Sequence, residues 1–412
     1  MKAVVFTLGC KVNGCESEAL IAGLAERGYE VTDKLEKADL YIVNTCAVTA
    51  EAEKKSRQTA SRIKRLNPDA KIIFTGCAVE KNPESFKNKS DDYLVTGVFG
   101  KNKLLELLDE KGEMLFPHAS EYEELTPVKS LKKRAFIKVQ DGCNSFCSYC
   151  IIPYLRGRSR SRSPQKIKDE IISVGAQEVV ITGIDLSDYR FNGLTLAGLL
   201  RELKAVKTRI RLGSLEARII DEDFLNACKE LYAFAPHFHL SLQSGSDSVL
   251  KKMNRHYTSR EFFEKTELIK RFFPDAGITT DVIAGFPTET DADFADTVSL
   301  IKRVGFTDIH PFIYSPRSGT VAYKMQDLPY DVKKARLDEL LRVKAELKNA
   351  FALREEGKAL DFLPEERKNG YTTGYTGNYL RIYVKADVSD NPERVRVLKP
   401  FRDGALAQPL ED

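Results

Sequence analysis

The sequence predicts an α/β protein with three parts, and three observations lead to this prediction. Short apolar runs alternate with amphipathic helical patterns through most of the chain, an order typical of parallel sheets. A charged, turn-rich segment at residues 118–134 divides this alternation into two series. Beyond the long helical pattern at 332–358, apolar and polar residues alternate and Gly and Asn interrupt them, as in antiparallel sheets. We therefore expect an N-terminal parallel α/β sheet domain (1–116), a partial (β/α)6 barrel with its C-terminal helix (134–358) and a small C-terminal antiparallel β-barrel (359–412).

Three runs in the first part resemble one another, because each is a β-rich apolar run that ends in a cysteine. They are VVFTLGC, ending at Cys10, LYIVNTC, ending at Cys46, and KIIFTGC, ending at Cys77. Helical patterns lie between them, at Ser17–Arg27 and Glu51–Arg65. The carboxyl ends of parallel strands meet at one edge of a sheet, where ligands bind. We therefore expect the three cysteines to converge, although 36 and 31 positions separate them in sequence.

The second part contains six further strand candidates, with amphipathic helices between them. One helix is predicted to begin with Ser163 as N-cap and Pro164 in the first helical position. In barrels of this kind the loops after the strands carry the chemistry. The stretch DGCNSFCSYC follows the first strand and places Cys143, Cys147 and Cys150 at the spacing C-x3-C-x2-C. The six strand candidates span residues 135–140, 178–183, 209–214, 237–243, 277–285 and 308–314.

Composition limits the classes of protein to consider. The chain has 412 residues, 42% hydrophobic and 30% charged, which is ordinary for a globular protein with sizeable cores. Its formal net charge of +4 is below that of a dedicated nucleic-acid domain, so basic groups for such a partner would have to cluster locally. We find no targeting signal, and no apolar run approaches the ~18 residues of a membrane span, which predicts a cytoplasmic protein without a membrane partner. In a reducing compartment, the eight cysteines are ligands or catalysts more often than disulfides.

Each cysteine triad lacks the fourth protein ligand that a structural zinc site needs. None of the five histidines, which would be candidates to complete such a site, is adjacent in sequence to either triad. Three cysteines can hold a 4Fe–4S cluster and leave one iron open to an external ligand. We therefore predict an iron–sulfur cluster at each triad, with a non-catalytic, zinc-dependent RNA-binding protein as the alternative from another class. The histidines are His118, His237, His239, His256 and His310.

The C-x3-C-x2-C loop after the first barrel strand resembles the radical S-adenosylmethionine superfamily, and Tyr149, the aromatic residue before the last cysteine, fits that pattern. In this superfamily the open iron binds the amino and carboxylate groups of S-adenosylmethionine (SAM). An electron from the cluster then cleaves SAM to a 5′-deoxyadenosyl radical. The resemblance implies that Cys143, Cys147 and Cys150 bind this 4Fe–4S cluster and that the second part is a radical SAM barrel.

Over its full length the chain resembles the methylthiotransferases, which insert a methylthio group into an unactivated C–H bond. The resemblance implies that Cys10, Cys46 and Cys77 hold an auxiliary 4Fe–4S cluster that carries the sulfur to be transferred. Both triads must then face one cavity, and all six cysteines are catalytic as well as metal-binding candidates. The resemblance also implies that the C-terminal part is a TRAM-like RNA-binding barrel.

Three branches of this family differ in substrate. TLGCKVN, at residues 7–13, and GYTGNYLRIYV, at 374–384, resemble the branch that modifies C2 of N6-threonylcarbamoyladenosine at position 37 of tRNAs. The alternatives are the branch that modifies isopentenyladenosine in tRNA and the branch that modifies an Asp of a ribosomal protein. The implied partners are the tRNA anticodon stem-loop, SAM, a reductant protein and a sulfur donor.

The resemblance further implies a set of SAM-binding residues at the ends of the barrel strands. Gly183 and Asp185 are expected near the SAM amino group, with a plain turn as the alternative. Glu216 would bind the ribose or the amino group, or else would be a surface residue at a helix start, and Arg255 would pair with the SAM carboxylate. The segment 283–286 is expected to meet the adenine base. The full set is Tyr149, Gly183, Asp185, Ser214, Glu216, Gln243, Arg255, Ile283, Gly285 and Phe286.

For a few further residues, a structural role is the alternative to a functional one. Four arginines on alternate positions follow the second triad, and in an extended loop they would share one face and hold tRNA phosphates, unless the loop is merely solvated. Cys228 lies in a helical pattern and is expected in the core, whereas Cys15 is a minor candidate for a cluster ligand. His237 and His239 alternate on a strand and are expected to pack rather than bind metal. The four arginines are Arg156, Arg158, Arg160 and Arg162.

Overall fold

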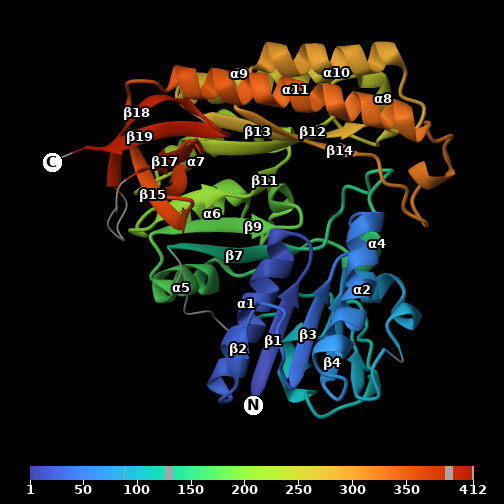
Figure 1. Ribbon diagram of the computed structural model, residues 1–412. Coiled ribbons are helices and arrows are strands. Elements are labelled where there is room, and N and C mark those ends of the chain that lie inside the picture. The colour runs from blue at the N-terminus through green and yellow to red at the C-terminus, as the bar shows by residue number, and fades with distance from the viewer. Residues whose placement is uncertain (88, 126–132, 386–392, 411–412) are drawn as a thin grey trace.

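The N-terminal part of the molecule is a six-stranded sheet in which all neighbouring strands are parallel (Figure 1). The computed structural model describes residues 1–87, 89–125, 133–385 and 393–410. The strands are β1 (Lys2–Thr7), β2 (Glu30–Thr32), β3 (Leu40–Thr45), β4 (Lys71–Gly76), β5 (Tyr93–Val95) and β6 (Gly112–Glu113), in the order β2-β1-β3-β4-β5-β6. The accompanying helices are α1 (Lys11–Glu26), α2 (Ala50–Leu66), α3 (Cys77–Lys81) and the 3-10 turns η1 (Pro83–Ser85) and η2 (Lys101–Glu106).

Each of the three central strands of this sheet leads directly into a cysteine. The apolar run of β3 is buried at every position, because helices cover both faces of a parallel sheet. Cys10 is the N-cap of α1, so this helix begins at Lys11 and not at the expected Ser17. Cys46 follows β3 directly, and Cys77 opens α3 after β4. The parallel order β1-β3-β4 therefore brings the three cysteines to one edge of the sheet.

The middle part is an open barrel built from two sheets, and all six expected strands are present in it. The strands are β7 (Arg134–Asp141), β8 (Arg160–Ser161), β9 (Glu178–Gly183), β10 (Arg209–Leu212), β11 (Ser214–Leu215), β12 (His237–Gln243), β13 (Gly277–Ala284) and β14 (Asp308–Ile313). One sheet has the order β10-β9-β7-β8 and the other β11-β12-β13-β14. The expected strand at 209–214 is divided at Gly213, whose N–H donates to the Ile181 carbonyl (2.8 Å), so one run contributes to both sheets. The short β8 is antiparallel to β7, while the other pairs are parallel.

Helices on the outside of this barrel cover a single large apolar core. The helical segments of this part are α4 (Ile152–Arg156), α5 (Pro164–Val174), α6 (Leu196–Glu202), α7 (Glu222–Lys229), α8 (Asp247–Lys252), α9 (Ser259–Phe272), α10 (Asp291–Val304) and the 3-10 turns η3 (Leu186–Asp188), η4 (Ala217–Ile219) and η5 (Ala322–Lys324). Of these, α4 packs on the core of the N-terminal part. Ser163 is the N-cap of α5 and Pro164 its first residue, as predicted, although the Ser163 side chain forms no capping hydrogen bond. Capping boxes begin α9 and α10, at Thr258 with Glu261 and at Thr290 with Asp293.

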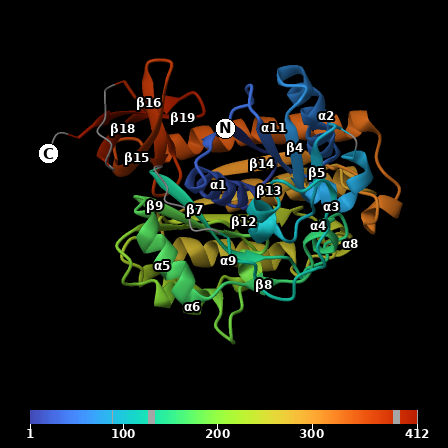
Figure 2. The same ribbon diagram turned by 90° about the horizontal axis from the view of Figure 1, so that it is seen from below.

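The C-terminal part is a closed five-stranded barrel that follows the long helix α11 (Tyr330–Arg354). Its strands are β15 (Ala359–Lys368), β16 (Tyr371–Thr376), β17 (Arg381–Val384), β18 (Glu393–Phe401) and β19 (Gly404–Pro409). They close in the order β15-β16-β17-β19-β18. The expected antiparallel pattern holds for four of the five pairs, whereas β17 and β19 are parallel. Figures 1 and 2 show α11 lying along the outside of β13 and β14 and ending at this barrel.

Polar contacts attach the C-terminal barrel to the open barrel. Arg211 on β10 donates to the backbone carbonyls of Thr376 and Gly377, each at 3.0 Å. Arg134 on β7 pairs with Glu365 on β15 (2.5 Å). The expected linker at 118–134 lies partly outside the described residues, which omit 126–132. Throughout the described ranges, no helix is long and apolar enough to cross a membrane.

Candidate active site

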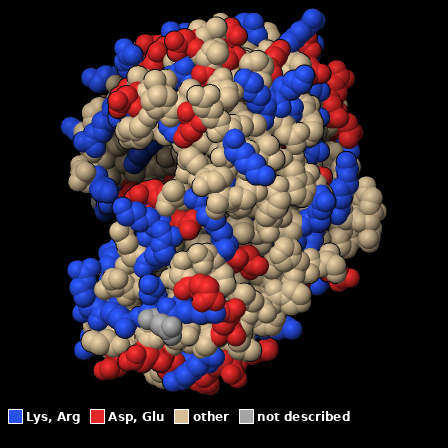
Figure 3. All heavy atoms as spheres, turned by 90° about the vertical axis from the view of Figure 1, so that its right-hand side faces the viewer, with Lys and Arg blue, Asp and Glu red and all other residues tan. Residues whose placement is uncertain are grey.

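All six triad cysteines line one cavity of about 790 Å³. The cavity lies between the carboxyl edge of the N-terminal sheet and the strand ends of the open barrel, and residues of the C-terminal barrel line it too. The face in Figure 3 is hollowed between the N-terminal part below and the open barrel above, with charged side chains at the rim. Three segments far apart in sequence therefore contribute to a single site.

The N-terminal triad is held by closely packed turns. At Gly9, where φ is +109°, an added Cβ would lie 2.8 Å from the Cys46 sulfur, so glycine is required. The Asn13 side-chain amide donates to the carbonyls of Leu8 (2.8 Å) and Thr45 (3.0 Å), which joins the turn after β1 to the end of β3. Cys10 is exposed, whereas Cys46 is buried, and its burial raises the thiol pKa to about 11.

The second triad lies on the loop between β7 and α4. The Cys150 N–H donates to the Cys147 carbonyl (2.9 Å), so the loop turns tightly around the three sulfurs. Burial raises the pKa of the Cys143 and Cys150 thiols to about 12. Arg255 lies beside this loop, with Nη1 at 3.3 Å from the Cys147 sulfur. Burial therefore favours the protonated forms of Cys143 and Cys150, whereas a cluster would bind them as thiolates.

The donor chemistry of both triads fits iron–sulfur clusters. Each triad offers three soft sulfur ligands at a cavity wall, and such ligands select iron–sulfur clusters, zinc or Cu(I). Across the parts of the chain that the structure describes, no three cysteine, histidine or carboxylate side chains are gathered closely enough to hold a single metal ion.

Comparisons with known proteins agree with this arrangement. Residues 2–99 match the model of an uncharacterized protein family, UPF0004, and residues 137–301 match the model of the radical SAM superfamily. The threonylcarbamoyladenosine tRNA methylthiotransferase MtaB of Bacillus subtilis is 36% identical, over 100% of this chain and 98% of that protein. The chain belongs to the radical SAM methylthiotransferase family.

Other members and a solved structure extend this finding. The tRNA-2-methylthio-N(6)-dimethylallyladenosine synthase of Thermodesulfovibrio yellowstonii is 33% identical, over 93% of this chain and 92% of that protein. The structure of the radical SAM methyltransferase TsrM from Kitasatospora setae, with cobalamin and a [4Fe-4S] cluster bound, superposes with a TM-score of 0.56. It is 14% identical and covers 78% of this chain and 77% of that one, so this likeness concerns the fold alone.

In this methylthiotransferase, seven of the ten expected SAM-binding residues line the cavity. The other three, Ile283, Gly285 and Phe286, are not among its lining residues in the described part of the chain. Phe286 is fully buried and meets the Tyr149 ring edge-on, with ring centroids 6.5 Å apart. That these ten residues contact SAM remains a prediction. The seven lining residues are Tyr149, Gly183, Asp185, Ser214, Glu216, Gln243 and Arg255.

Two carboxylates and two arginines lie together beside the second triad. Glu216 pairs with Arg255 (2.9 Å) and with Arg218 (2.9 Å). Asp185 accepts from the Ser145 hydroxyl (3.2 Å), and burial together with nearby Glu216 raises the pKa of its carboxyl group. The methylthiotransferase thus has acidic and basic groups at the same cavity wall, which suits a zwitterionic amino-acid ligand.

The prediction that the four alternate arginines share one phosphate-binding face is wrong. Arg156, Arg160 and Arg162 are buried, and only Arg158 is exposed, with its guanidinium over the Phe146 ring (4.5 Å). The loop is not evenly extended, because α4 ends at Arg156. Arg156 and Arg160 pair with the buried Asp141, and Arg162 pairs with the half-buried Glu124 and Glu170.

Arg156 is the centre of a buried charge cluster between the two triads. Its guanidinium donates to Glu16 (2.8 Å) and to Asp141 (3.0 Å), and its Nε lies 3.4 Å from the Cys77 sulfur. Burial alone would raise the pKa of Glu16, but Arg156, Lys101 and Lys138 hold it well below its usual range. The cluster therefore connects α1, β7 and α4 through charges that stay ionised.

Several cavity residues carried no recognisable sequence signal. Tyr379 stacks between Tyr375 (4.4 Å between centroids) and His237 (4.3 Å). Burial and the nearby Arg211 lower the pKa of His237 well below its usual range. Only the tertiary fold brings the β16–β17 turn of the methylthiotransferase to β12, so local pattern does not reveal this stack. Cys15 and Cys228 are buried and are not among the residues that line this cavity in the described chain.

Proposed function

We propose that this enzyme attaches a methylthio group to C2 of N6-threonylcarbamoyladenosine at position 37 of tRNAs. The observation that carries the proposal is that both cysteine triads line the same cavity, since sulfur transfer and hydrogen abstraction must occur at the same carbon. The likeness to MtaB of Bacillus subtilis, at 36% identity, favours this nucleoside over dimethylallyladenosine, for which the relative quoted above is 33% identical.

In this proposal Cys143, Cys147 and Cys150 hold the SAM-binding 4Fe–4S cluster, and Cys10, Cys46 and Cys77 hold the auxiliary one. When bound, the two clusters and SAM supply the 5′-deoxyadenosyl radical and the methylthio sulfur, with electrons from a reductant protein and sulfur from a donor. The protein binds the clusters, SAM and the substrate and orients them toward one another. Its cavity wall brings the two triads to one site.

Within that wall, two side chains would orient SAM. Arg255 supplies a cation beside the Cys147 sulfur, where the SAM carboxylate is expected. Glu216 supplies the matching anion, since it is held by both Arg255 and Arg218 and so keeps a fixed position. The charges of the two side chains are complementary to the carboxylate and amino groups of SAM.

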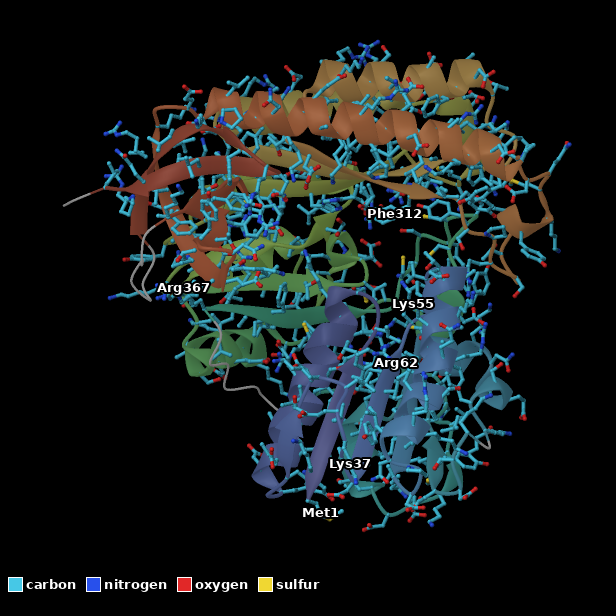
Figure 4. All side chains as sticks on the ribbon, in the orientation of Figure 1. Met1, Lys37, Lys55, Arg62, Phe312 and Arg367 are labelled. Carbon is cyan, nitrogen blue, oxygen red and sulfur yellow. The ribbon has the colours of Figure 1, made fainter. Side chains whose placement is uncertain are left out.

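RNA would reach the cavity across α2. This helix lies at the rim, because the Ala50 N–H donates to Ser315 after β14 (3.0 Å) and Glu53 pairs with Arg317. Figure 4 shows Lys55 near Phe312, a ring that lines the cavity and is 51% exposed, with Arg62 further down the helix. Cations beside an exposed ring are typical of single-stranded RNA sites. The exposed bases of α2 are Lys54, Lys55, Arg62, Lys64 and Arg65. The C-terminal barrel, which lies on the other side of the molecule from α2 in Figure 1, would contact the RNA separately as a TRAM-like module.

Mass spectrometry of nucleosides from total tRNA, with and without the gene, tests the substrate. We expect loss of methylthio-threonylcarbamoyladenosine and accumulation of its precursor. An unchanged profile would contradict the tRNA assignment and direct the search to an Asp of a ribosomal protein, whereas loss of the methylthio-isopentenyl nucleoside would favour that branch.

Two cysteine variants test the division of labour between the triads. Cys46→Ala is expected to cleave SAM but to form no methylthio product, and Cys147→Ala is expected to do neither. Anaerobically purified wild type should contain ~8 iron atoms, the sum of two four-iron clusters. A colourless protein with zinc would support the non-catalytic alternative instead.

A further inference from the structure

Lys11 differs from every other cation that lines the cavity, because it has no carboxylate partner among the described residues. Six other cations line the cavity, and each lies between 2.5 and 3.6 Å from a carboxylate oxygen. Lys11 forms neither an ion pair nor a hydrogen bond with its side chain to any residue in the described ranges. The six paired cations are Arg134, Arg156, Arg211, Arg255, Lys348 and Arg381.

Within the described residues, the charged groups that act on Lys11 leave its ammonium group without a carboxylate of its own. Arg134 and Arg211 are near enough to oppose the Lys11 ammonium electrostatically, and Asp281 is the carboxylate that attracts it. Asp281, however, already lies 3.2 Å from Nε2 of His239. Lys11 is itself exposed where it lines the cavity, so an anionic ligand that enters the cavity can pair with its ammonium group without displacing another partner.

Lys11 is also close to the expected chemistry in the chain. It follows Cys10 directly and is the first residue of α1, so the short turn that carries an auxiliary-cluster ligand also carries this cation. The substituent on N6 of the proposed nucleoside is a threonine joined through a carbamoyl group, and it keeps a free carboxylate. An isopentenyl substituent ends in methyl groups and has no charge.

We propose that Lys11 binds the carboxylate of the threonylcarbamoyl group and thereby selects this nucleoside over nucleosides with an uncharged N6 substituent. The inference rests on the proposed function and names the residue that recognises its substrate. A Lys ammonium is a compact point charge, which suits a single carboxylate.

A competition assay tests this on the reconstituted enzyme. An anticodon stem-loop with threonylcarbamoyladenosine is mixed in equal amount with the same stem-loop in which the threonine carboxylate is a carboxamide, and the product ratio gives the ratio of kcat/KM. We expect the wild type to prefer the acid by roughly 10- to 100-fold, as for a hydrogen bond to a charged group. Lys11→Met should bring the ratio close to one.

Lys348→Met is the matched control, because Lys348 lines the same cavity but already has Asp308 and Asp403 within 3.6 Å. It should keep the wild-type preference for the acid. Iron content is measured for each variant, and Lys11→Gln replaces Lys11→Met if the latter does not load iron.

A wild-type ratio near one, or a wild-type preference retained in the Lys11 variant, would overturn the inference. A wild type that ignores both stem-loops but modifies the isopentenyladenosine stem-loop would overturn the proposed function as well, and this result is distinct from the first two.

Discussion

Arg156 shows how one side chain can couple two distant motifs. It lies six positions after Cys150 in the chain, yet its Nε is 3.4 Å from the Cys77 sulfur of the other triad. It also holds Glu16 on α1 and Asp141 on β7, both of them buried. The relative position of the two triads therefore depends on a fully buried guanidinium.

We expect Arg156→Met to destabilise the metal-free chain by about 3–5 kcal/mol, because it leaves Glu16 and Asp141 buried with less compensating charge. Denaturant unfolding measures this. Arg158→Met is the control, since Arg158 is exposed and has only the Phe146 ring beneath it, and it should cost less than 1 kcal/mol, about the value of an exposed cation–π contact. Equal losses for the two variants would show that the buried cluster contributes no more stability than a surface contact.

Arg255 gives a second prediction at this scale, concerning SAM. Arg255→Met removes the cation beside the Cys147 sulfur, so the dissociation constant for SAM should rise roughly 10- to 100-fold, as for loss of a hydrogen bond to a charged group. Equilibrium dialysis on protein of matched iron content measures it. Arg218→Met, which removes the other partner of Glu216, should have a smaller effect. An unchanged dissociation constant for Arg255→Met would exclude Arg255 from the SAM site.

At the scale of elements, β9 is the strand on which charges of several elements meet. Glu178, its first residue, is fully buried and pairs with Arg134 on β7 and with Arg209 and Arg211 on β10. Burial alone would raise the pKa of Glu178, but these arginines, Arg211 foremost, lower it to about 2. Two of these arginines, Arg134 and Arg211, also contact the C-terminal barrel, so this carboxylate supports both the sheet and the junction.

This pKa predicts a pH dependence of stability. The pKa of this carboxyl group is about 2 in the folded state and near 4.5 in the unfolded state. The group therefore stabilises the fold fully at pH values above 4.5, and this stabilisation is lost as the pH falls toward 2. The difference in unfolding free energy between wild type and Glu178→Gln should therefore narrow by about 3 kcal/mol between pH 5 and pH 2. Urea unfolding at a series of pH values measures it. Glu264→Gln, on the exposed face of α9, should show no such change.

Some elements and contacts of this fold could be predicted from the sequence, and others could not. The three strands that lead to Cys10, Cys46 and Cys77, their convergence and the six barrel strands were predicted from local pattern plus one rule about parallel sheets. The short strands β2, β5, β6 and β8 were not, because two or three residues carry too little pattern. The burial of Arg156 was not, because its partner Glu16 lies 140 positions away and no local pattern connects them. The parallel pairing of β17 with β19 was missed for a similar reason, since alternation reveals a strand but not its neighbour.

At the scale of the whole molecule, the basic face of α2 lies at the entrance to the cavity. Lys55→Gln with Arg62→Gln should weaken tRNA binding and reduce the slope of log affinity against log salt by about one to two units, since about 0.7–0.9 counterions are released per phosphate contact. The matched control is Lys34→Gln with Lys37→Gln, and Figure 4 shows Lys37 at the opposite end of the N-terminal part. Equal slopes for the two double variants would place the RNA elsewhere.

The C-terminal barrel contributes Tyr375, Tyr379 and Arg381 to the wall of the cavity. It is therefore not an independent attachment that could be exchanged between relatives without effect on the reaction. A chimera that takes this module from a relative would therefore inherit part of the relative's pocket as well.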